Sequence, residues 1–425
     1  MHDSFDINIE QISKTEGHAD IEVKIRKGKV EDVKLKINEN KRFYTQAVRN
    51  RHFSSVPQFV SRICGTCSIA HLTCSIESIE KCLEITPTKQ TELLRKLSVY
   101  GMMIRDHALH LYFFCLPDVF NTDSVFDFDE TKNYLIKQGF NVKSLGNNLS
   151  KIVAGRAVHP TFEKVGQFSH LPSKENLKEL LSEFKATRDT VLELIKIFYE
   201  CNFDLSREST FVSLVTDDFS FLEGEIASSD GMKIKEDEYW NHLERIIIPY
   251  SQATGFRFRD KEYMVGALAR LNLNRESIHK NSKKDISEIL KVFPSNNIYH
   301  NNLAQSIEIL HCIDHTIQIL EENEFTRESP PEIKTREGKG VGVIEAPRGT
   351  LYHMVELNRE GKVQFANFVI PTAQNQIKME NDIKNHLPSI LDKDKHFIYH
   401  ELEKIIRAYD PCMSCASHFL RLKWI

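Results

Sequence analysis

The sequence lacks three features, and each absence argues against a class of protein. Basic residues are not in excess, because 56 lysines and arginines stand against 60 aspartates and glutamates, and this balance argues against a nucleic-acid-binding protein. No apolar run approaches the roughly 18 residues of a transmembrane helix. Residues 1–6 have neither the basic nor the apolar segment of a secretory signal. We therefore expect a cytoplasmic protein without a membrane span.

The composition is that of a folded protein with several cysteines. Of the 425 residues, 41% are hydrophobic and 27% are charged, which is typical of globular chains and not of disordered ones. Nine residues are cysteine. In a reducing compartment, cysteines are more often inert, catalytic or metal-bound than paired in disulfides. The chemistry of this chain therefore depends on which of the nine bind metal or react.

Strand patterns lie near both ends of the chain. Apolar residues alternate with polar ones over 21–25 and again over 33–37, and Lys27-Gly28 between them predicts the turn of a β-hairpin. Residues 330–342 contain two prolines and three glycines among charges, which predicts a loop. Strands are predicted after this loop, at 343–344 and 363–370, with a turn at 359–361.

The middle of the chain is predicted to be helical. Apolar residues recur every three or four positions in four segments, at about 68–84, 93–111, 173–198 and 302–322. Ser173 is suited to cap the third helix. The second is apolar on nearly all sides, so we expect it to be buried. Four helices of this length predict a central bundle in an α+β, predominantly α-helical, domain.

Two cysteine pairs have the spacing of metal ligands. Cys64 and Cys67 form one CxxC motif, and Cys412 and Cys415 form another. Two thiolates at this spacing can bind one ion, and four suit a soft or borderline metal. Structural zinc modules place about 15–20 residues between their pairs, whereas 344 residues separate these two. A catalytic or cofactor-bearing site is therefore favoured, although a single CxxC motif could also be a redox dithiol.

Both motifs resemble the signatures of one family. Residues 62–71, Arg-Ile-Cys-Gly-Thr-Cys-Ser-Ile-Ala-His, resemble the RxCGxCxxxH signature of nickel–iron hydrogenase large subunits, and residues 410–418 resemble their DPCxxCxxH signature. Further similarities follow in the family's order at residues 16–18, 155–160, 345–351 and 369–375. The resemblance covers nearly the whole chain. It is closest to the cytoplasmic branch that couples hydrogen to NAD(P) or a deazaflavin.

The resemblance implies a fold and a division of the chain. The expected fold is that of the hydrogenase large subunit, with a central bundle of long helices and small peripheral β-sheets. We expect one domain over 1–425. Within it, the expected parts are an N-terminal β region (1–45), a helix-rich bundle (57–335), and a β-hairpin with a C-terminal metal-binding segment (336–425).

The resemblance also implies a ligand set for a nickel–iron centre. Cys64 and Cys412 would bind nickel alone, and Cys67 and Cys415 would bridge nickel to an iron that carries carbon monoxide and cyanide. Thiolates are soft, strongly donating ligands that suit both metals, and coordination keeps them deprotonated. Thr372 would donate a hydrogen bond to a cyanide.

The implied reaction is the reversible heterolytic cleavage of H2 into protons and electrons. Cys412 would take the proton first, and Glu16 would relay it. Neighbouring groups can shift the pKa of a carboxylate near a buried metal thiolate toward neutral pH. The remaining implied site residues lie around the metals. They are Arg348 after Ala346 and Pro347, with Asp106 and Asp410 as its charged partners, and His71, whose ring would face a bridging sulfur.

Each implied role has a simpler alternative that the residues alone leave open. Glu16 could be a solvated carboxylate, and Asp106 could form an ion pair with Arg105 or another neighbour. Arg348 after a proline could be a surface turn residue. His71 could be a hydrogen-bonded core histidine. The other five cysteines lie in mostly apolar, helical surroundings and are interpreted as small core residues: Cys74, Cys82, Cys115, Cys201 and Cys312.

The chain departs from the family at two places. The resemblance implies a second metal, Mg or Fe, at His418, but Thr45 stands where relatives supply a glutamate ligand to it. Most relatives also carry a C-terminal extension that a maturation protease removes. Only residues 419–425 follow His418 here, and we expect the same protease to remove them.

The sequence also implies partner subunits. It has no ferredoxin-like cysteine run and no GxGxxG nucleotide fingerprint. Electrons would therefore leave through an iron–sulfur small subunit, and then through flavin-, NAD(P)- or deazaflavin-linked subunits. The alternatives are a non-catalytic hydrogenase-like scaffold subunit, whose known relatives lose the ligand cysteines, and a structural Zn(Cys)4 protein.

Overall fold

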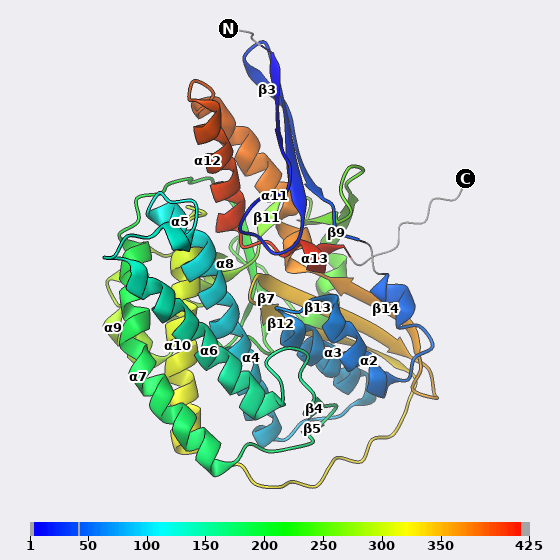
Figure 1. Ribbon diagram of the computed structural model, residues 1–425. Helices are drawn as coiled ribbons and strands as arrows, with labels where there is room; N and C mark the ends of the chain where they lie inside the picture. Colours follow the sequence, from blue (N-terminus) through cyan, green and yellow to red (C-terminus); the bar gives the residue numbers. More distant parts are fainter. Residues whose placement is uncertain (1–3, 41–42, 418–425) are drawn as a thin grey trace, which may run out of the picture.

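The computed structural model describes residues 4–40 and 43–417 (Figure 1). Figure 1 shows a bundle of long helices on one side and a sheet covered by helices on the other. A narrow N-terminal sheet and two C-terminal helices extend beyond both. Both predictions of class, α+β and predominantly helical, are confirmed.

The N-terminal sheet confirms the predicted hairpin. Strands β1 (Phe5–Ile9), β2 (Ala19–Arg26) and β3 (Lys29–Ile37) are antiparallel in chain order. Alternate residues of β2 are buried, because its inner face packs on the core and its outer face meets solvent. Helix α11 (Pro371–His386) covers part of the buried face and donates a hydrogen bond from Gln376 to the carbonyl of Leu35 (3.0 Å).

The helix bundle differs from the prediction in one member. It contains α4 (Lys89–Ala108), α6 (Asn133–Ala154), α7 (Lys174–Tyr199) and α10 (His300–Glu322). Three of these were predicted, and Ser173 caps α7 by accepting a hydrogen bond from the Asn176 N–H (3.2 Å). Helix α6 was not predicted. Its Gly146 lets it approach α4, where a Cβ would lie 2.6 Å from the Arg105 nitrogen.

The fourth predicted bundle helix has another role. Helix α3 (Ser68–Leu83) lies on a sheet formed by β12 (Gly338–Ala346), β13 (Gly349–Leu357) and β14 (Val363–Val369), which are antiparallel in chain order. The predicted loop over 330–342 is therefore wrong after residue 337. Gly340 and Gly342 are strand residues whose missing side chains let β12 lie directly against the main chain of α3.

Smaller elements connect these parts. Helix α4 continues as a π-helical stretch from Leu109 to Cys115, and α5 (Leu116–Val119) follows. A four-stranded sheet has the order β11 (Tyr263–Met264), β6 (Thr210–Val215), β7 (Glu225–Ser228), β8 (Lys233–Ile234). The other short elements are α1 (Tyr44–Ala47), α2 (Val56–Val60), β4 (Glu163–Lys164), β5 (Gln167–Phe168), β9 (Leu243–Ile247), β10 (Thr254–Phe258), α8 (Ala267–Asn274), α9 (Lys280–Asp285), α12 (Lys395–Ala408) and α13 (Met413–Ala416).

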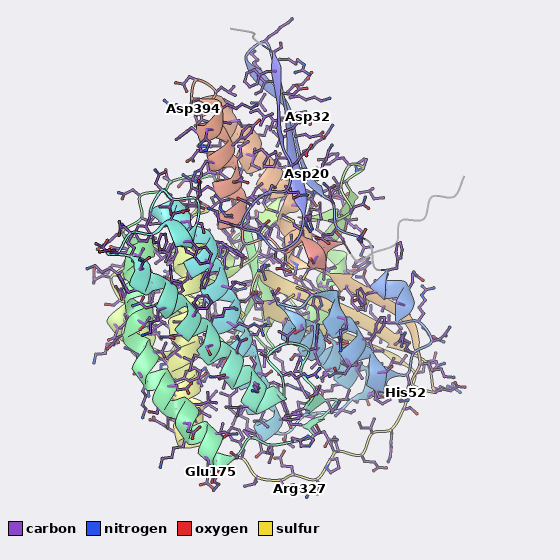
Figure 2. The ribbon with its side chains drawn as sticks, in the orientation of Figure 1. Asp20, Asp32, His52, Glu175, Arg327 and Asp394 are labelled. Carbon is purple, nitrogen blue, oxygen red and sulfur yellow. The ribbon has the colours of Figure 1, made fainter. Side chains whose placement is uncertain are left out.

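The surface carries many charged side chains. Figure 2 shows several at the outer ends of elements, among them Asp32 on the N-terminal sheet, Glu175 at the start of α7 and Asp394 before α12. Within the described part of the chain, no helix is both long and apolar enough to cross a bilayer.

One half-buried carboxyl group predicts a pH dependence of stability. Glu380 of α11 accepts hydrogen bonds from the Leu35 N–H (2.9 Å) and the Tyr250 hydroxyl (2.9 Å), and burial raises its pKa to about 7. Between about pH 4.5 and 7, the folded chain keeps a proton that the unfolded chain has lost. The free energy of unfolding therefore falls as the pH rises through this window.

Glu380→Gln should reduce the loss of unfolding free energy between about pH 4.5 and 7 by about 1–3 kcal/mol. Unfolding by urea, followed by circular dichroism at a series of pH values, measures it. Glu324→Gln is the matched control, because that carboxylate is exposed after α10 and should leave the slope unchanged. An equal slope in the wild type and Glu380→Gln would contradict the prediction.

Candidate metal centre

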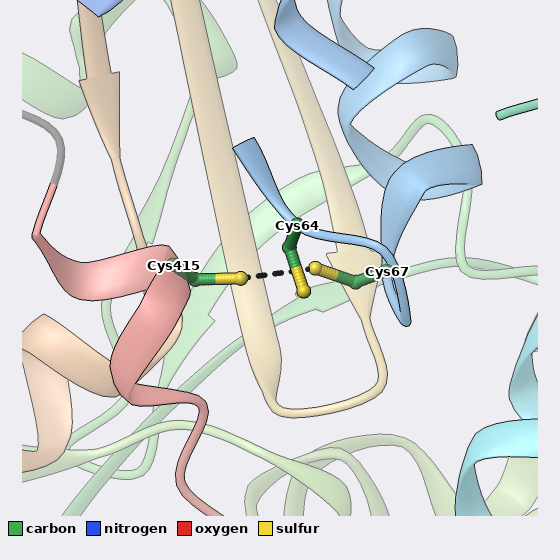
Figure 3. A group of neighbouring side chains, drawn as sticks. All are labelled: Cys64, Cys67 and Cys415. Atoms are coloured by element: carbon green, nitrogen blue, oxygen red, sulfur yellow. Dashed lines mark hydrogen bonds between the residues drawn. The ribbon is translucent and has the colours of Figure 1, made fainter. Parts of the chain in front are cut away.

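The four predicted ligand cysteines meet in the interior. The sulfurs of Cys64 and Cys412 lie 3.4 Å apart, those of Cys67 and Cys415 lie 3.1 Å apart, and those of Cys412 and Cys415 lie 3.0 Å apart. All four residues are buried. Figure 3 shows Cys64 and Cys67 on one loop and Cys415 reaching them from α13 on the opposite side. Each sulfur of the first pair therefore faces one sulfur of the second.

Local structure explains how each pair presents its sulfurs. Cys64 is extended and Cys67 occupies the N-cap position of α3, which leaves their sulfurs within 4.8 Å of each other. Cys412 likewise precedes α13. The N-terminus of a helix such as α3 carries partial positive charge, which stabilises a nearby thiolate.

The donor set fits a soft metal centre. All nine cysteines lie among the described residues, and none is in a disulfide. Among the described residues, Cys64, Cys67 and Cys415 have ligand atoms within 4.8 Å of one another, and so do Glu16, Cys64 and Cys412. Hydrogen bonds from the other thiols, Cys412 foremost, lower the pKa of Cys64 well below its usual value. Four converging sulfurs with a stabilised thiolate are the ligands that nickel and iron favour.

A buried arginine lies beside the sulfurs between two aspartates. Arg348 donates from Nη1 to Asp106 (2.6 Å) and from Nη2 to Asp410 (3.0 Å). Burial alone would lower the pKa of Arg348, but the two carboxylates raise it well above its usual value. Asp410 adopts the left-handed conformation (φ 49°), which is uncommon outside glycine. The structure thus brings the three predicted residues together, and Arg348 is not a surface residue.

Arg105, the alternative partner of Asp106, makes other contacts. Arg105 is 5% exposed and donates to the main-chain carbonyls of Thr66 and Ala157. It therefore joins the loop of the first cysteine pair to residues 155–160. Sequence reasoning missed this role, because nothing in a helical pattern shows that a charged residue of α4 points into the core.

Glu16 lies next to the second cysteine pair. Its main chain forms an isolated parallel bridge with Cys412, and its carbonyl accepts a hydrogen bond from the Met413 N–H (2.8 Å). Burial and the nearby Cys64 sulfur raise the pKa of the Glu16 carboxyl group. Glu16 is half-buried, so it is not the fully solvated carboxylate of the alternative interpretation.

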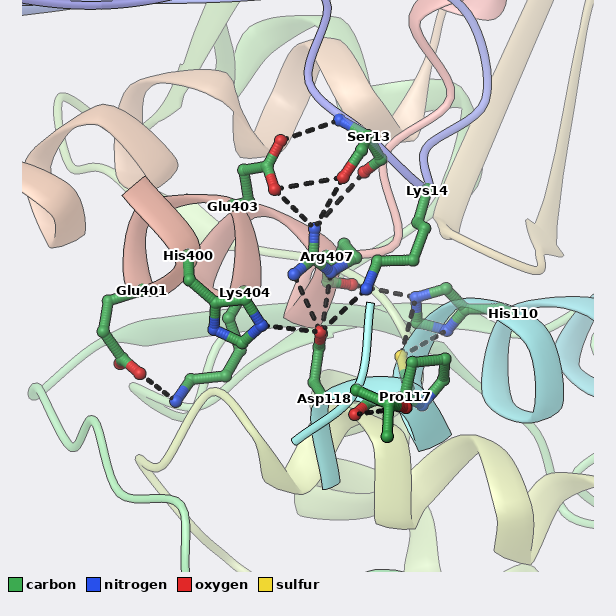
Figure 4. A network of polar contacts seen from close by, with 12 residues as sticks. Ser13, Lys14, His110, Pro117, Asp118, His400, Glu401, Glu403, Lys404 and Arg407 are labelled. Atoms are coloured by element: carbon green, nitrogen blue, oxygen red, sulfur yellow. Dashed lines mark hydrogen bonds and ion pairs between the residues drawn. The ribbon is translucent and has the colours of Figure 1, made fainter. Parts of the chain in front are cut away.

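An ion-pair network holds the segment that leads to Glu16 (Figure 4). Arg407 of α12 donates to Asp118 through Nε (2.7 Å) and Nη2 (2.8 Å), and to the Ser13 carbonyl (3.3 Å). Lys14 binds the same Asp118 carboxylate (3.1 Å). A bidentate arginine–carboxylate pair has a defined geometry. The network therefore joins the N-terminal segment to α5 and α12.

The carboxylate of Asp410 has a second support. Its Oδ2 accepts a hydrogen bond from the Gln305 amide (2.9 Å), and the Gln305 oxygen contacts Nδ1 of His110 (2.7 Å). Nε2 of His110 contacts the Arg407 carbonyl (2.8 Å). Sequence reasoning missed Gln305 and His110, which lie on facing helical segments and show no motif of their own. They link the aspartate beside Arg348 to the network of Figure 4.

A small cavity adjoins the sulfurs. The hydroxyl of Thr372 accepts a hydrogen bond from the Cys412 N–H (2.9 Å), so its own proton is available for another acceptor. The cavity is lined by Cys67, His71, Ala346, Pro347, Arg348, Leu351, Ile370, Pro371, Thr372, Cys412 and Cys415. It therefore contains the three predicted pocket residues Ala346, Pro347 and Thr372.

The structure places His71 beside a second histidine. Nδ1 of His71 lies 3.1 Å from Nε2 of His353, and both rings are buried. His71 also lines the cavity with Cys67. The hydrogen bond from His71 to a bridging sulfur stays a prediction.

The proposed second metal site is only partly described. His418 and residues 419–425 lie outside the described residues. Thr45 lies in the short helix α1.

Of the five cysteines interpreted as core residues, four are buried: Cys74, Cys82, Cys115 and Cys312. Cys201 is half-buried, because α7 ends at Tyr199 and the chain leaves the core there.

Comparison with known families gives a consistent match. The family model described as nickel-dependent hydrogenase matches residues 42–170 and 232–418. The alpha subunit of sulfhydrogenase 2 from Pyrococcus furiosus is 32% identical, over 98% of this chain and 100% of that subunit. Subunit beta of the NAD-reducing hydrogenase HoxS from Cupriavidus necator is 26% identical, over 97% and 94% of the respective chains.

Solved structures have the same fold. An NAD+-reducing [NiFe]-hydrogenase in the H2-reduced state superposes with a TM-score of 0.85 at 24% identity, over 97% of this chain and 99% of that one. A [NiFeSe]-hydrogenase from Dm. baculatum superposes with a TM-score of 0.79 at 20% identity, over 98% and 100%. The whole described architecture therefore has counterparts among solved hydrogenases.

The convergence of the sulfurs makes a prediction about metal binding. Cys412→Ser should lower the metal bound per chain more than about tenfold, because it removes one of four thiolates from the cluster. Cys201→Ser is the control, since its half-buried sulfur lies outside the cluster and its loss should leave metal content nearly unchanged. Elemental analysis of both purified proteins measures this. Equal losses would contradict the division of the cysteines into ligands and other residues.

Proposed function

This chain belongs to the nickel-dependent hydrogenase family and is the large subunit of a nickel–iron hydrogenase, an oxidoreductase, and we propose that it cleaves H2 reversibly into protons and electrons. The observation that carries the proposal is the pairing of sulfurs from the two CxxC motifs beside the buried Arg348. A structural metal site needs only the sulfurs. A buried arginine between two aspartates adds the charge that a catalytic site requires.

The four cysteines are the proposed ligands of the metals. Cys64 and Cys412 face each other and would hold nickel, while Cys67 and Cys415 face each other and would contribute ligands to both nickel and iron. When bound, the centre supplies the Lewis acidity and the redox change that split H2. Ala346 and Pro347 offer an apolar wall, and Thr372 offers a hydroxyl donor, for the carbon monoxide and cyanide ligands of iron.

Arg348 supplies a fixed positive charge in this scheme. A guanidinium stays protonated at every working pH, so it cannot act as the base that accepts a proton from H2. Asp106 and Asp410 hold its plane from two sides. The charge and the N–H groups are then preorganised at the cavity, where they orient the small molecule that enters.

Proton transfer is assigned to Cys412 and Glu16. The Cys412 sulfur accepts the proton first, and the Glu16 carboxylate receives it next, because their ligand atoms lie within 4.8 Å. A raised pKa suits Glu16 to this step, because burial and the Cys64 sulfur make its carboxyl group a better proton acceptor than an ordinary glutamate. His71 lines the cavity beside the sulfurs and is proposed to orient the Cys67 sulfur.

Electrons must leave through another chain. Four of the nine cysteines form the centre, and among the described residues no other group of three metal-binding side chains lies within ligand distance. An iron–sulfur small subunit is therefore the proposed partner, followed by flavin-, NAD(P)- or deazaflavin-linked subunits, in the cytoplasm. NAD-reducing and F420-non-reducing hydrogenases are among the similar proteins.

The second metal at His418 and removal of residues 419–425 by a maturation protease are proposed with this assignment.

Spectroscopy of the native protein tests the proposal. We expect equimolar nickel and iron, infrared bands of bound carbon monoxide and cyanide, and H2-dependent reduction of a viologen dye. Zinc alone would support the structural Zn(Cys)4 alternative. A nickel–iron centre without turnover would support the scaffold alternative. Absence of the infrared bands from protein matured in its own host would refute the assignment.

The role of Glu16 gives a sharper prediction. Glu16→Gln keeps the size of the side chain but cannot carry a proton, so H2 turnover should fall at least about 100-fold while nickel content is unchanged. Glu10→Gln, at an exposed position after β1, is the control and should keep full activity. The measurement is turnover divided by bound nickel. Full activity in Glu16→Gln would exclude the proposed proton route.

A further inference from the structure

Arg270 of helix α8 is a fully buried arginine whose N–H groups all have acceptors. Its Nε and one Nη2 hydrogen bind the two carboxylate oxygens of Glu308 (2.6 and 2.8 Å). One Nη1 hydrogen binds Glu345 (2.7 Å). The remaining two bind the carbonyls of Ala346 and Pro347 (both 3.1 Å). A guanidinium has five such donors, so every one is used and the group has a single defined orientation.

The two carbonyls belong to the residues directly before Arg348. They lie at the turn between β12 and β13, where Gly349 has φ 130° and a Cβ would lie 2.5 Å from the Val265 side chain. Gly266 also approaches this turn closely, since its Cβ would lie 3.4 Å from the Arg348 carbonyl. The start of α8 therefore supports the turn by packing, and Arg270 supports it by hydrogen bonds.

The two carboxylates anchor Arg270 to the rest of the core. Glu345 accepts from the Leu214 N–H of β6 (2.8 Å) and the Thr350 hydroxyl (2.7 Å) with its other oxygen. Glu308 of α10 contacts Nε2 of His107 (2.8 Å). His107 follows Asp106 on α4, and Asp106 binds Arg348. Arg348 and its aspartate partner are thus both attached to the same buried ion-pair network.

We propose that Arg270 is a positioning residue, which holds the Ala346–Pro347 carbonyls and thereby fixes where the Arg348 guanidinium lies beside the sulfurs. The proposal rests on the proposed function, in which Arg348 orients the molecule that reacts. A displacement of about 1 Å at a reacting group can cost about 100-fold in rate. A lysine cannot replace Arg270, because its three donors on one nitrogen cannot reach two carboxylates and two carbonyls in one plane.

Two variants test the proposal. Arg270→Lys keeps the charge and loses the planar donor arrangement. Arg270→Met combined with Glu308→Gln removes the arginine without leaving its strongest partner as an uncompensated buried carboxylate. We expect H2 turnover per bound nickel to fall about 10-fold to 100-fold in both, with nickel content retained and the infrared bands of the iron ligands shifted.

A double-mutant cycle separates positioning from general stability. If Arg270 acts through Arg348, Arg270→Lys should cost little further activity in an Arg348→Lys background, because the group it positions is gone. Additive losses would overturn the proposal, as would turnover per nickel equal to the wild type. Arg188→Lys is the matched control. Its guanidinium pairs with Asp314 inside the helix bundle (2.7 Å), and its loss should leave turnover per nickel unchanged.

A structural readout keeps the test independent of catalysis. A crystal structure of the Arg270→Lys variant should show Arg348 displaced from Asp106 or Asp410. An undisplaced Arg348 would overturn the positioning role even if the wild type proved inactive. Inactivity of the wild type together with a displaced Arg348 would refute the proposed function and leave the positioning role intact.

Discussion

The contact between the two cysteine pairs is the constraint on which the rest of this structure depends. The paired residues are 348 positions apart, so opposite ends of the chain must close around one site. The first pair is presented by the start of α3, and the second by the start of α13. The N-terminal segment is attached to the second pair through the bridge between Glu16 and Cys412. Metal binding at such a site would stabilise the closed arrangement, because ligands from distant segments converge only in the folded chain.

Three buried arginines, with their hydrogen-bond partners, support the site that contains the sulfurs. Arg348 pairs with two aspartates beside the cavity, and Arg105 binds main-chain carbonyls behind the first cysteine pair. Arg270 uses all its donors on two carboxylates and two carbonyls. A buried charge is costly unless it is paired or hydrogen-bonded, and Arg270, with every donor used, is held in one orientation. This rigidity suits a site whose charges must not move.

The spacing of apolar residues predicted helices and strands correctly where one face of the element is apolar. It failed where contacts with distant segments determine the element. The hairpin of β2 and β3, the helix α7 and its Ser173 cap follow directly from the sequence pattern. Helix α6 contains Gly146, which looks unfavourable in a helix but lets α4 come close. Strand β13 is buried on both faces, so its sequence shows no alternation.

The sequence by itself determined the residue types of the site and the family to which they belong. CxxC spacing specifies that two sulfurs can reach one ion, and the motifs around both pairs identify the proposed ligands. The resemblance implied that Asp106 binds Arg348, but the residues alone left Arg105 open as its partner, and nothing in the sequence showed that Arg270 and Gln305 support the site. Only the tertiary structure decided these partners. A hydrogen bond depends on distances and angles between groups far apart along the chain, and local patterns carry no information about them.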